Sequence, residues 1–188
     1  MRVPVCIQNR HIHLSQVDAE RLFGKGYVFS IEKKLTQPWE YKAVERVSIK
    51  WKDGVLENVE IIMPFRKFTQ VEITDSDNQI LWIHAKVTKS GELKEAEECS
   101  IIWPKWSVYL QHGVIVSERH IHMSVADAKD LWFRNNQIVK CYIPWNNWMV
   151  IDNVRIRSND KFVFDIHLNM DDAKNFWLKT SDWVELSK

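Results

Sequence analysis

Five histidines stand at two similar places in the chain and at a third place near its end. His11 and His13 form a His-x-His pair within "RHIHLS", and His120 and His122 repeat it within "RHIHMS". Two side chains that are two residues apart on a strand point to the same face, so each pair can present two imidazoles together. With His167 they make five imidazoles, and imidazole is a preferred ligand of zinc. The pattern favours a zinc-binding protein, although histidines beside helix caps can also be purely structural.

The residues that follow these histidines predict how they are held. The segments "HLSQVDA", "HMSVADA" and "HLNMDDA" all fit His-(Leu/Met)-(Ser/Asn)-x-x-Asp-Ala. Ser or Asn at that place is a good helix N-cap, and Asp three residues later suits the positive end of a helix. Each histidine is expected to end a strand just before a short helix, where a neutral imidazole is favoured, as metal binding requires. The apolar pairs expected to pack these helices onto the rest of the fold are Leu22-Phe23, Leu131-Trp132 and Phe176-Trp177.

A second group of candidates lies in "PFRKFTQVEIT", residues 64–74. Arg66 can present a planar fork of donors to phosphate oxygens. Glu72 lies on an expected strand, and a carboxylate of this kind can complete a zinc shell. A surface salt bridge is the competing interpretation for both residues.

Most of the chain that must position these residues is predicted to be β-structure. Apolar and polar side chains alternate in residues 44–51, and Asp53-Gly54 gives a hairpin turn into residues 55–62. A second hairpin is expected around Ser90-Gly91, between residues 80–87 and 99–103. Short strands separated by turns are typical of barrels or sandwiches. Further strands are expected at 113–118, 138–143, 148–157, 161–167 and 182–187.

Composition narrows the class of protein. A chain of 188 residues can form one large domain or two small ones. A net charge of +1 argues against nucleic-acid binding, and no apolar run approaches the ~20 residues that span a membrane. The three separated cysteines predict reduced thiols in a cytoplasmic protein, with Cys6 in the core. The ten tryptophans are expected in the core or at an interface, and those at 145–148 could instead stack on adenine.

The quoted motifs, together with "GVIVSERHIHMSVADA" and "DKFVFDIHLNMDDA", resemble the PduL-type phosphate propanoyltransferases, also called propanediol-utilisation phosphotransacylases. The resemblance runs from about residue 3 to residue 175. It implies a mainly β fold of two small β-barrel domains, each capped by short α-helices, with the active site at their interface. Residues 1–9 and 118–188 would form one discontinuous barrel, and residues 10–117 would form the other.

The resemblance also implies the reaction and the residues that carry it. A short-chain acyl-CoA and phosphate would exchange to acyl phosphate and coenzyme A, with two zinc ions per chain. Arg66 matches the arginine that holds phosphate. The residues that match the two metal sites are His11, His13 and Glu72 for one site and His120, His122 and His167 for the other.

Three further basic residues are candidates for binding the substrate: Arg10, Lys67 and Arg119. Arg10 and Arg119 each precede a His-x-His pair and should point to the opposite face of its strand. There they can reach the phosphates of coenzyme A or form buried ion pairs, and the sequence leaves both alternatives open.

The chain departs from the family pattern in residues 133–150 and 169–175, which puts coenzyme A contacts in doubt more than metal binding. Two other functions therefore stay open. One is a zinc-dependent hydrolase, and the other is a catalytically degenerate relative that keeps zinc for stability or for binding a partner. The first His-x-His pair begins at residue 11, which leaves no room for an N-terminal microcompartment-targeting segment, so a cytoplasmic enzyme is expected. The sequence is also compatible with a homo-oligomer.

Overall fold

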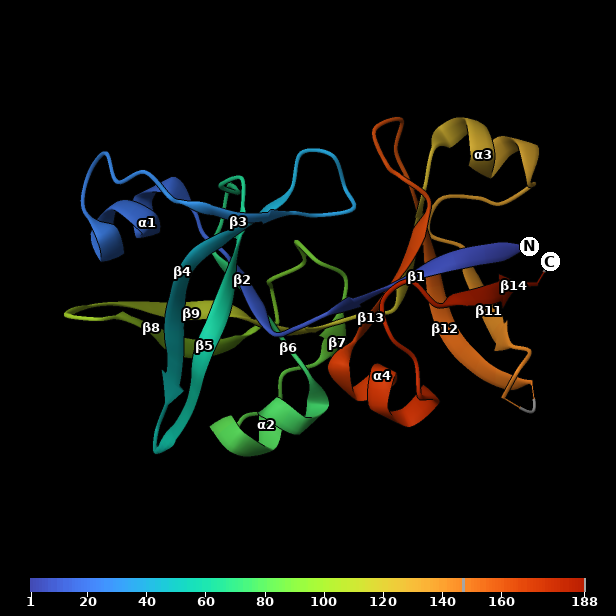
Figure 1. Ribbon diagram of the computed structural model, residues 1–188. Coiled ribbons are helices and arrows are strands. Elements are labelled where there is room, and N and C mark those ends of the chain that lie inside the picture. Colours follow the sequence, from blue (N-terminus) through green and yellow to red (C-terminus); the bar gives the residue numbers. More distant parts are fainter. Residues whose placement is uncertain (147, 188) are drawn as a thin grey trace. The chain divides into compact units, whose positions relative to one another are not determined.

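The computed structural model of the chain describes residues 1–146 and 148–187 (Figure 1). It divides into two compact units. Unit 1 comprises Met1–Gln8, Thr36–Pro38 and Glu118–Lys188, and unit 2 comprises Asn9–Leu35 and Trp39–Ser117. Strands dominate both units, so the mainly β fold class predicted from the sequence is confirmed.

The described residues of unit 1 form a closed barrel with two short helices. Its elements are β1 (Arg2–Gln8), β10 (His120–Met123), α3 (Val125–Asp130), β11 (Ile138–Ile143), β12 (Met149–Ser158), β13 (Asp165–Asn169), α4 (Met170–Phe176) and β14 (Trp183–Leu186). The strand order is β1-β13-β10-β12-β11-β14. The N-terminal strand β1 pairs in parallel with β13 and antiparallel with β14, so the blue strand in Figure 1 lies beside the red ones. The first residues of the chain therefore complete a barrel built mainly from its last seventy.

Unit 2 is a second barrel, again with two short helices among the residues that the structure describes. Its elements are β2 (His11–His13), α1 (Gln16–Phe23), β3 (Ile31–Lys34), β4 (Tyr41–Trp51), β5 (Gly54–Met63), β6 (Gln70–Ile73), α2 (Asp75–Leu81), β7 (Val87–Thr88), β8 (Glu97–Trp103) and β9 (Trp106–Ser117). The strands pair in the order β4-β5-β2-β6-β9. β8 closes the ring because it pairs with both β9 and β4. β3 and β7 add to β4 and β9 outside this ring.

The hydrophobic cores explain which way the histidines face. On β10, Ile121 and Met123 are fully buried in the core of unit 1 and alternate with the two histidines of that strand. On β2, Ile12 is buried in the core of unit 2 and separates the histidines of the first pair. Successive side chains on a strand point to opposite faces. Each His-x-His pair therefore lies on the face of its sheet that is turned away from the barrel core.

The helices begin at the predicted N-caps, and the structure adds one more. Ser15, Ser124 and Asn169 accept hydrogen bonds from backbone N–H groups at the starts of α1, α3 and α4. Thr74 and Asp77 form a reciprocal capping box that starts α2, which the sequence analysis missed. None of the described helices is long and apolar enough to cross a membrane.

The presence of α2 overturns one predicted hairpin. Residues 80–87 were expected to form a strand joined through Ser90-Gly91 to residues 99–103. Residues 80–81 instead end α2, and the short strand β7 pairs in parallel with β9 rather than with β8. The physical reason is the capping box, since it satisfies the first free N–H groups of a helix at this point.

The apolar pairs at the C-terminal ends of the three predicted helices only partly pack as predicted. Leu22 lies in the core of unit 2, and Leu131 and Phe176 pack against the core of unit 1. Trp132 and Trp177, in contrast, are 85% and 76% exposed. Both have a left-handed backbone, with φ of 63° and 52°, as is common where a helix ends. The chain turns away there, so the prediction that these two tryptophans pack onto the barrel is wrong.

Candidate metal and substrate site

The first cluster of metal-ligating side chains lies in unit 2 and consists of His11, His13 and Glu72. Strands β2 and β6 run antiparallel, and His11 is the register partner of Glu72. The Nε2 atoms of His11 and His13 lie 3.7 and 3.8 Å from the two carboxylate oxygens of Glu72. Two ligands of a tetrahedral zinc, each bonded at about 2.0–2.1 Å, are themselves about 3.4 Å apart. The observed spacing is too long for hydrogen bonds and close to what a shared metal ion needs.

Backbone carbonyls fix the orientation of both rings. The Nδ1 atom of His11 lies 2.8 Å from the carbonyl oxygen of Asn9, and that of His13 lies 3.2 Å from the carbonyl oxygen of Ile62. A carbonyl oxygen only accepts, so each Nδ1 carries a proton and donates it. Each Nε2 is then left with its lone pair directed toward Glu72, which is the arrangement of a histidine that binds metal.

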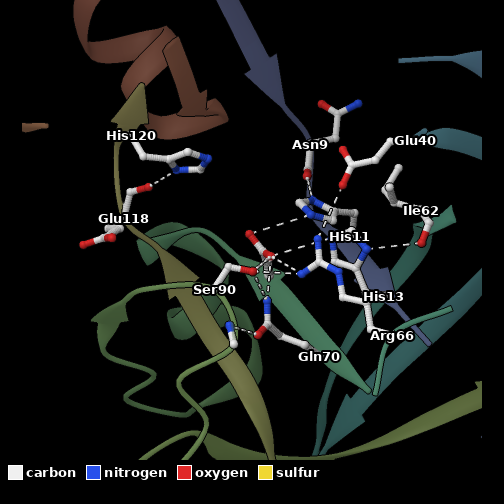
Figure 2. A network of polar contacts seen from close by, with 12 residues as sticks. Asn9, His11, His13, Glu40, Ile62, Arg66, Gln70, Ser90, Glu118 and His120 are labelled. Atoms are coloured by element: carbon white, nitrogen blue, oxygen red, sulfur yellow. Dashed lines mark hydrogen bonds and ion pairs between the residues drawn. The ribbon is translucent and has the colours of Figure 1, made fainter. Parts of the chain in front are cut away.

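Arg66 lies beside this cluster and is held by three acceptors. Its guanidinium donates to Ser90 Oγ at 2.9 Å and lies 3.5 Å from Glu40 Oε1 and 3.8 Å from Glu72 Oε1. Gln70 Nε2 donates to Glu72 Oε1 at 2.6 Å and to Ser90 Oγ at 2.8 Å, and Ser90 Oγ donates to the same Glu72 oxygen at 3.0 Å. The side chains of Arg66, Gln70 and Ser90 therefore converge on the Glu72 carboxylate. Figure 2 shows these three side chains gathered beside His11 and His13.

Electrostatics in this cluster favour the protonation states that bind metal. Burial would raise the pKa of Glu72, but the neighbouring His11, His13 and Arg66 outweigh it and hold that pKa below its usual range. Burial lowers the pKa of His13 well below its ordinary value, and Arg66 lowers it further. The cluster therefore contains an ionised carboxylate and a neutral imidazole, which are the forms that coordinate a metal ion.

The second cluster lies in unit 1 and consists of His120, His122 and His167. Strands β10 and β13 run antiparallel, with His120 in register with His167. The three ring centroids lie 4.4 to 5.0 Å apart. His120 Nδ1 donates to the carbonyl oxygen of Glu118 at 2.8 Å, which leaves Nε2 available. His167 Nδ1 is buried and has no hydrogen-bond partner among the described residues, so it is a candidate metal donor.

Asp165 ties two of these histidines together. Its Oδ1 lies 3.2 Å from His122 Nδ1, and its Oδ2 lies 3.0 Å from His167 Nε2. Burial would raise the pKa of Asp165, but its contacts with the two imidazoles lower it. Burial lowers the pKa of His122 to about 4. Burial also opposes a charge on His167, yet Asp165 and Cys6 raise the pKa of His167 to about 10, so a metal ion binding there must displace a proton.

Gln37 supports Asp165 from a distant part of the sequence. Its segment, Thr36–Pro38, belongs to unit 1 although β3 and β4, on either side of it in sequence, belong to unit 2. Gln37 Nε2 donates to Asp165 Oδ1 at 3.1 Å and to the carbonyl oxygen of Val163 at 3.0 Å, and its Oε1 accepts from the Val163 N–H at 3.1 Å. Gln37 is only 1% exposed, so these bonds form in a dry environment where they orient the carboxylate strongly. The sequence analysis missed both Gln37 and Asp165.

The two clusters repeat one structural plan. In each unit a His-x-His strand pairs antiparallel with a strand that carries the third ligand, Glu72 on β6 or His167 on β13. Two residues after that ligand comes the N-cap of a helix with a capping box, Thr74 or Asn169. Glu72 is therefore the structural counterpart of His167. The sequence analysis grouped His167 with the two His-x-His corners. It missed the corner that truly matches His167, because Glu72 stands there in place of a histidine.

Comparison with known proteins supplies the family. A family model described as phosphate propanoyltransferase matches residues 4–179. The chain belongs to the phosphate propanoyltransferase family. Relatives named phosphate propanoyltransferase include one from Thermotoga maritima, 38% identical over 181 residues that cover 96% of this chain and 86% of the relative. Another from Rhodopseudomonas palustris is 36% identical over 187 residues, covering 100% of this chain and 83% of the relative. The family predicted from the motifs is confirmed.

The phosphate propanoyltransferase fold brings together the six residues predicted as metal ligands in two groups of three. Each group is the one that the sequence analysis assigned, with Arg66 next to the group that contains Glu72. Their role as zinc ligands, and the expectation that both groups serve one active site, stay predictions. The competing interpretation of Arg66 and Glu72 as a surface salt bridge does not describe Glu72, because this residue is only 5% exposed.

The three basic residues predicted to bind substrate have other contacts in the structure. Arg10 lies 3.0 Å from Asp77 at the start of α2, and Arg119 lies 2.8 Å from Asp172 at the start of α4. Both aspartates are buried, so the ion-pair alternative describes these two arginines in the structure. Lys67 is exposed and lies over the ring of Phe68. A part for the three residues in binding substrate stays a prediction.

The segments that depart from the family pattern have structural roles of their own. In 169–175, Asn169 and Asp172 form the capping box of α4. In 133–150, Asn135 Oδ1 accepts from the Ser158 N–H, and residues 144–146 and 148 form the turn between β11 and β12. Asn147 lies outside the described residues. Trp145 and Trp148 are 50% and 57% exposed, so they are not core residues, and their stacking on adenine stays a prediction.

The cysteines differ in their surroundings. Cys99 and Cys141 are buried in the two hydrophobic cores, and burial raises the pKa of each thiol to about 12. All three cysteines are free thiols, as predicted. Cys6, however, is half-buried and lies beside Asp165 and His167, so the prediction that it belongs to the core is wrong.

Proposed function

We propose that this member of the phosphate propanoyltransferase family is a zinc-dependent enzyme that interconverts short-chain acyl-CoA plus phosphate with acyl phosphate plus coenzyme A. The observation that carries the proposal is the pair of buried three-ligand clusters, one of them adjacent to Arg66. The names of the relatives support a phosphate and an acyl-CoA as substrates. The choice of zinc rests on the donor sets, because imidazole nitrogen with carboxylate oxygen is a typical zinc shell.

The residues that would hold the two ions follow from the clusters. His11, His13 and Glu72 would hold one zinc, and His120, His122 and His167 would hold the other. Each set has three protein donors, which is the number found in catalytic zinc sites that keep a position for substrate. When bound, zinc would supply a Lewis acid that stabilises the thiolate of coenzyme A as it leaves.

Arg66 would bind and orient phosphate. Its terminal nitrogens contact Ser90, Glu40 and Glu72, which fix the position of the guanidinium, and the side chain is still 35% exposed, so phosphate can reach it. A guanidinium held in this way can donate two parallel hydrogen bonds to phosphate oxygens. Ser90 and Gln70 in turn keep the Glu72 carboxylate in place, since both donate to the same oxygen.

The transfer needs no nucleophile from the protein. An oxygen of the bound phosphate attacks the thioester carbonyl carbon, the carbon–sulfur bond breaks, and the sulfur leaves as the coenzyme A thiolate, which takes a proton from solvent. Holding the two substrates next to each other removes a large part of the entropic barrier to this bimolecular step. Burial lowers the pKa of His13 well below its ordinary value, so this imidazole stays neutral near pH 7 and does not compete with Arg66 for phosphate.

The proposal is tested by following release of the coenzyme A thiol from acetyl-CoA and propanoyl-CoA by zinc-loaded protein. We expect release that requires phosphate, with acyl phosphate formed in equal amount. Release without any need for phosphate would instead indicate a zinc-dependent hydrolase. Absence of release with either thioester, in protein that is folded and contains zinc, would indicate a catalytically degenerate relative.

Arg66→Ala tests the role of Arg66 in binding phosphate, with Lys105→Ala as the matched control. Phosphate-dependent release should be lost while zinc content and the circular dichroism spectrum stay as in the unmodified protein. Lys105→Ala, on an exposed turn, should leave the rate unchanged.

A further inference from the structure

Cys6 lies on the same face of the unit 1 sheet as the histidine cluster. β1 pairs in parallel with β13, and Cys6 is the register partner of His167. On β1, the odd-numbered residues Val3 and Val5 are buried in the barrel core, and Cys6 lies at an even-numbered position. Because side chains alternate along a strand, the thiol of Cys6 points away from that core and toward the side that His167 occupies.

The surrounding atoms form a second donor set. The Sγ of Cys6, a carboxylate oxygen of Asp165 and a ring nitrogen of His167 all lie within 4.8 Å of one another. The thiol receives one long contact, from Thr36 Oγ1 at 3.9 Å. An independent observation points to a missing partner, since His167 Nδ1 is buried and has no hydrogen bond within the described residues. Sulfur, oxygen and nitrogen donors at this spacing suit a thiophilic divalent ion.

The repeated plan of the two units shows that this thiol is specific to unit 1. In unit 2 the counterpart of His167 is Glu72, and its partner on the parallel neighbouring strand is Ile115. Ile115 is 1% exposed and has no donor atom in its side chain. The two units therefore offer the same three-ligand geometry, but only unit 1 adds a thiol at the position next to the third ligand.

We propose that Cys6 is a metal ligand in this chain and that, with His167 and Asp165, it supplies a thiolate donor to the ion held in unit 1. The inference rests on the part of the proposed function that has the protein bind zinc. On binding, the thiol proton passes to solvent and a sulfur–metal bond forms. A soft thiolate makes the unit 1 centre more selective for zinc, cobalt or cadmium over magnesium or manganese than the nitrogen and oxygen set of unit 2.

The test is a titration of metal-free protein with cobalt(II), followed by absorption. Cobalt bound to nitrogen and oxygen in a near-tetrahedral site absorbs in the visible, and a thiolate ligand adds a charge-transfer band in the near ultraviolet. We expect both features in the unmodified protein. Cys6→Ser and Cys6→Ala should lose the ultraviolet band and keep the visible absorption, with the unit 1 ion bound at least tenfold more weakly.

Cys141→Ala is the matched control, because its thiol is buried in the core of the same unit. This variant should keep the ultraviolet band. Survival of the band in Cys6→Ser, or its absence from unmodified protein whose visible absorption shows bound cobalt, would overturn the inference while leaving the proposed function intact. Equilibrium dialysis that finds no bound cobalt or zinc would overturn both the proposed zinc binding and this inference.

Discussion

Replacing Asp165 by Asn should weaken one of the two proposed metal sites and leave the other unchanged. Asp165 is 1% exposed, and its two oxygens accept from His122, His167 and Gln37. Asn has the same shape but carries one NH₂ group in place of an oxygen. If that group faces His167, Nε2 must accept a hydrogen bond, and the ring proton moves to Nδ1, the nitrogen that is otherwise available to metal. If it faces the other way, the donors of His122 and Gln37 meet another donor.

The size of the effect follows from the role of such supporting residues. Mutation of a group that orients a ligand histidine typically lowers metal affinity 10- to 100-fold. That corresponds to about 1.4 to 2.8 kcal/mol of binding free energy. The unit 2 site has Gln70, a neutral residue, at the place equivalent to Asp165, since Gln70 is the register partner of His13 as Asp165 is of His122. The unit 2 site should therefore keep its affinity in the variant.

The assay is competition between metal-free protein and a chromophoric chelator for zinc, fitted with two binding sites. Asp165→Asn should show one site weakened by at least tenfold and one within error of the unmodified protein. Asp160→Asn, on an exposed turn of the same unit, is the control and should change neither. If both sites of Asp165→Asn stay within about threefold of the unmodified protein, the role given to Asp165 is refuted.

Three further predictions concern Arg66, the helix cap Thr74 and His122. Arg66→Lys should raise the KM for phosphate about tenfold or more with the KM for acyl-CoA unchanged, because Lys cannot form the bidentate fork; equal effects on both KM values would contradict this. Thr74→Ala should lower the free energy of unfolding by about 1 kcal/mol through loss of the α2 cap, measured in urea, and no loss would contradict the capping role. Metal-free protein should lose stability as the pH falls from about 6.5 toward 4, because the pKa of His122 is lowered to about 4 and the unfolded chain binds more protons in that range; a flat profile between these values would contradict it.

The sequence predicted what local patterns encode. The His-x-His pairs, the Ser and Asn caps and the alternation in residues 44–51 all depend on neighbours within a few positions, so the strand at 44–51, three of the helices and the six residues of the two clusters could be named as candidates. Where the sequence departed from a repeat, prediction failed. α2 was missed because its corner begins with Glu72 rather than a histidine, although the Thr74-x-x-Asp77 pattern could have found it.

Long-range pairing explains the other residues that were missed. Asp165 and Gln37 are 128 positions apart, and only the closure of the barrel shows that their side chains meet. Cys6 faces His167 because the first strand pairs with the thirteenth, and spacing along the chain contains no sign of that register. Trp132 and Trp177 are exposed because the backbone becomes left-handed at those residues, which an apolar pair after a helix does not indicate.

Two separable metal sites, one in each unit, are the central claim of this account. The most direct test counts zinc per folded chain by elemental analysis in the unmodified protein, in Glu72→Gln and in His122→Asn. We predict about two ions, about one ion and about one ion, with none above background when both substitutions are combined. A zinc content that does not differ between the unmodified protein and the combined variant would contradict the claim.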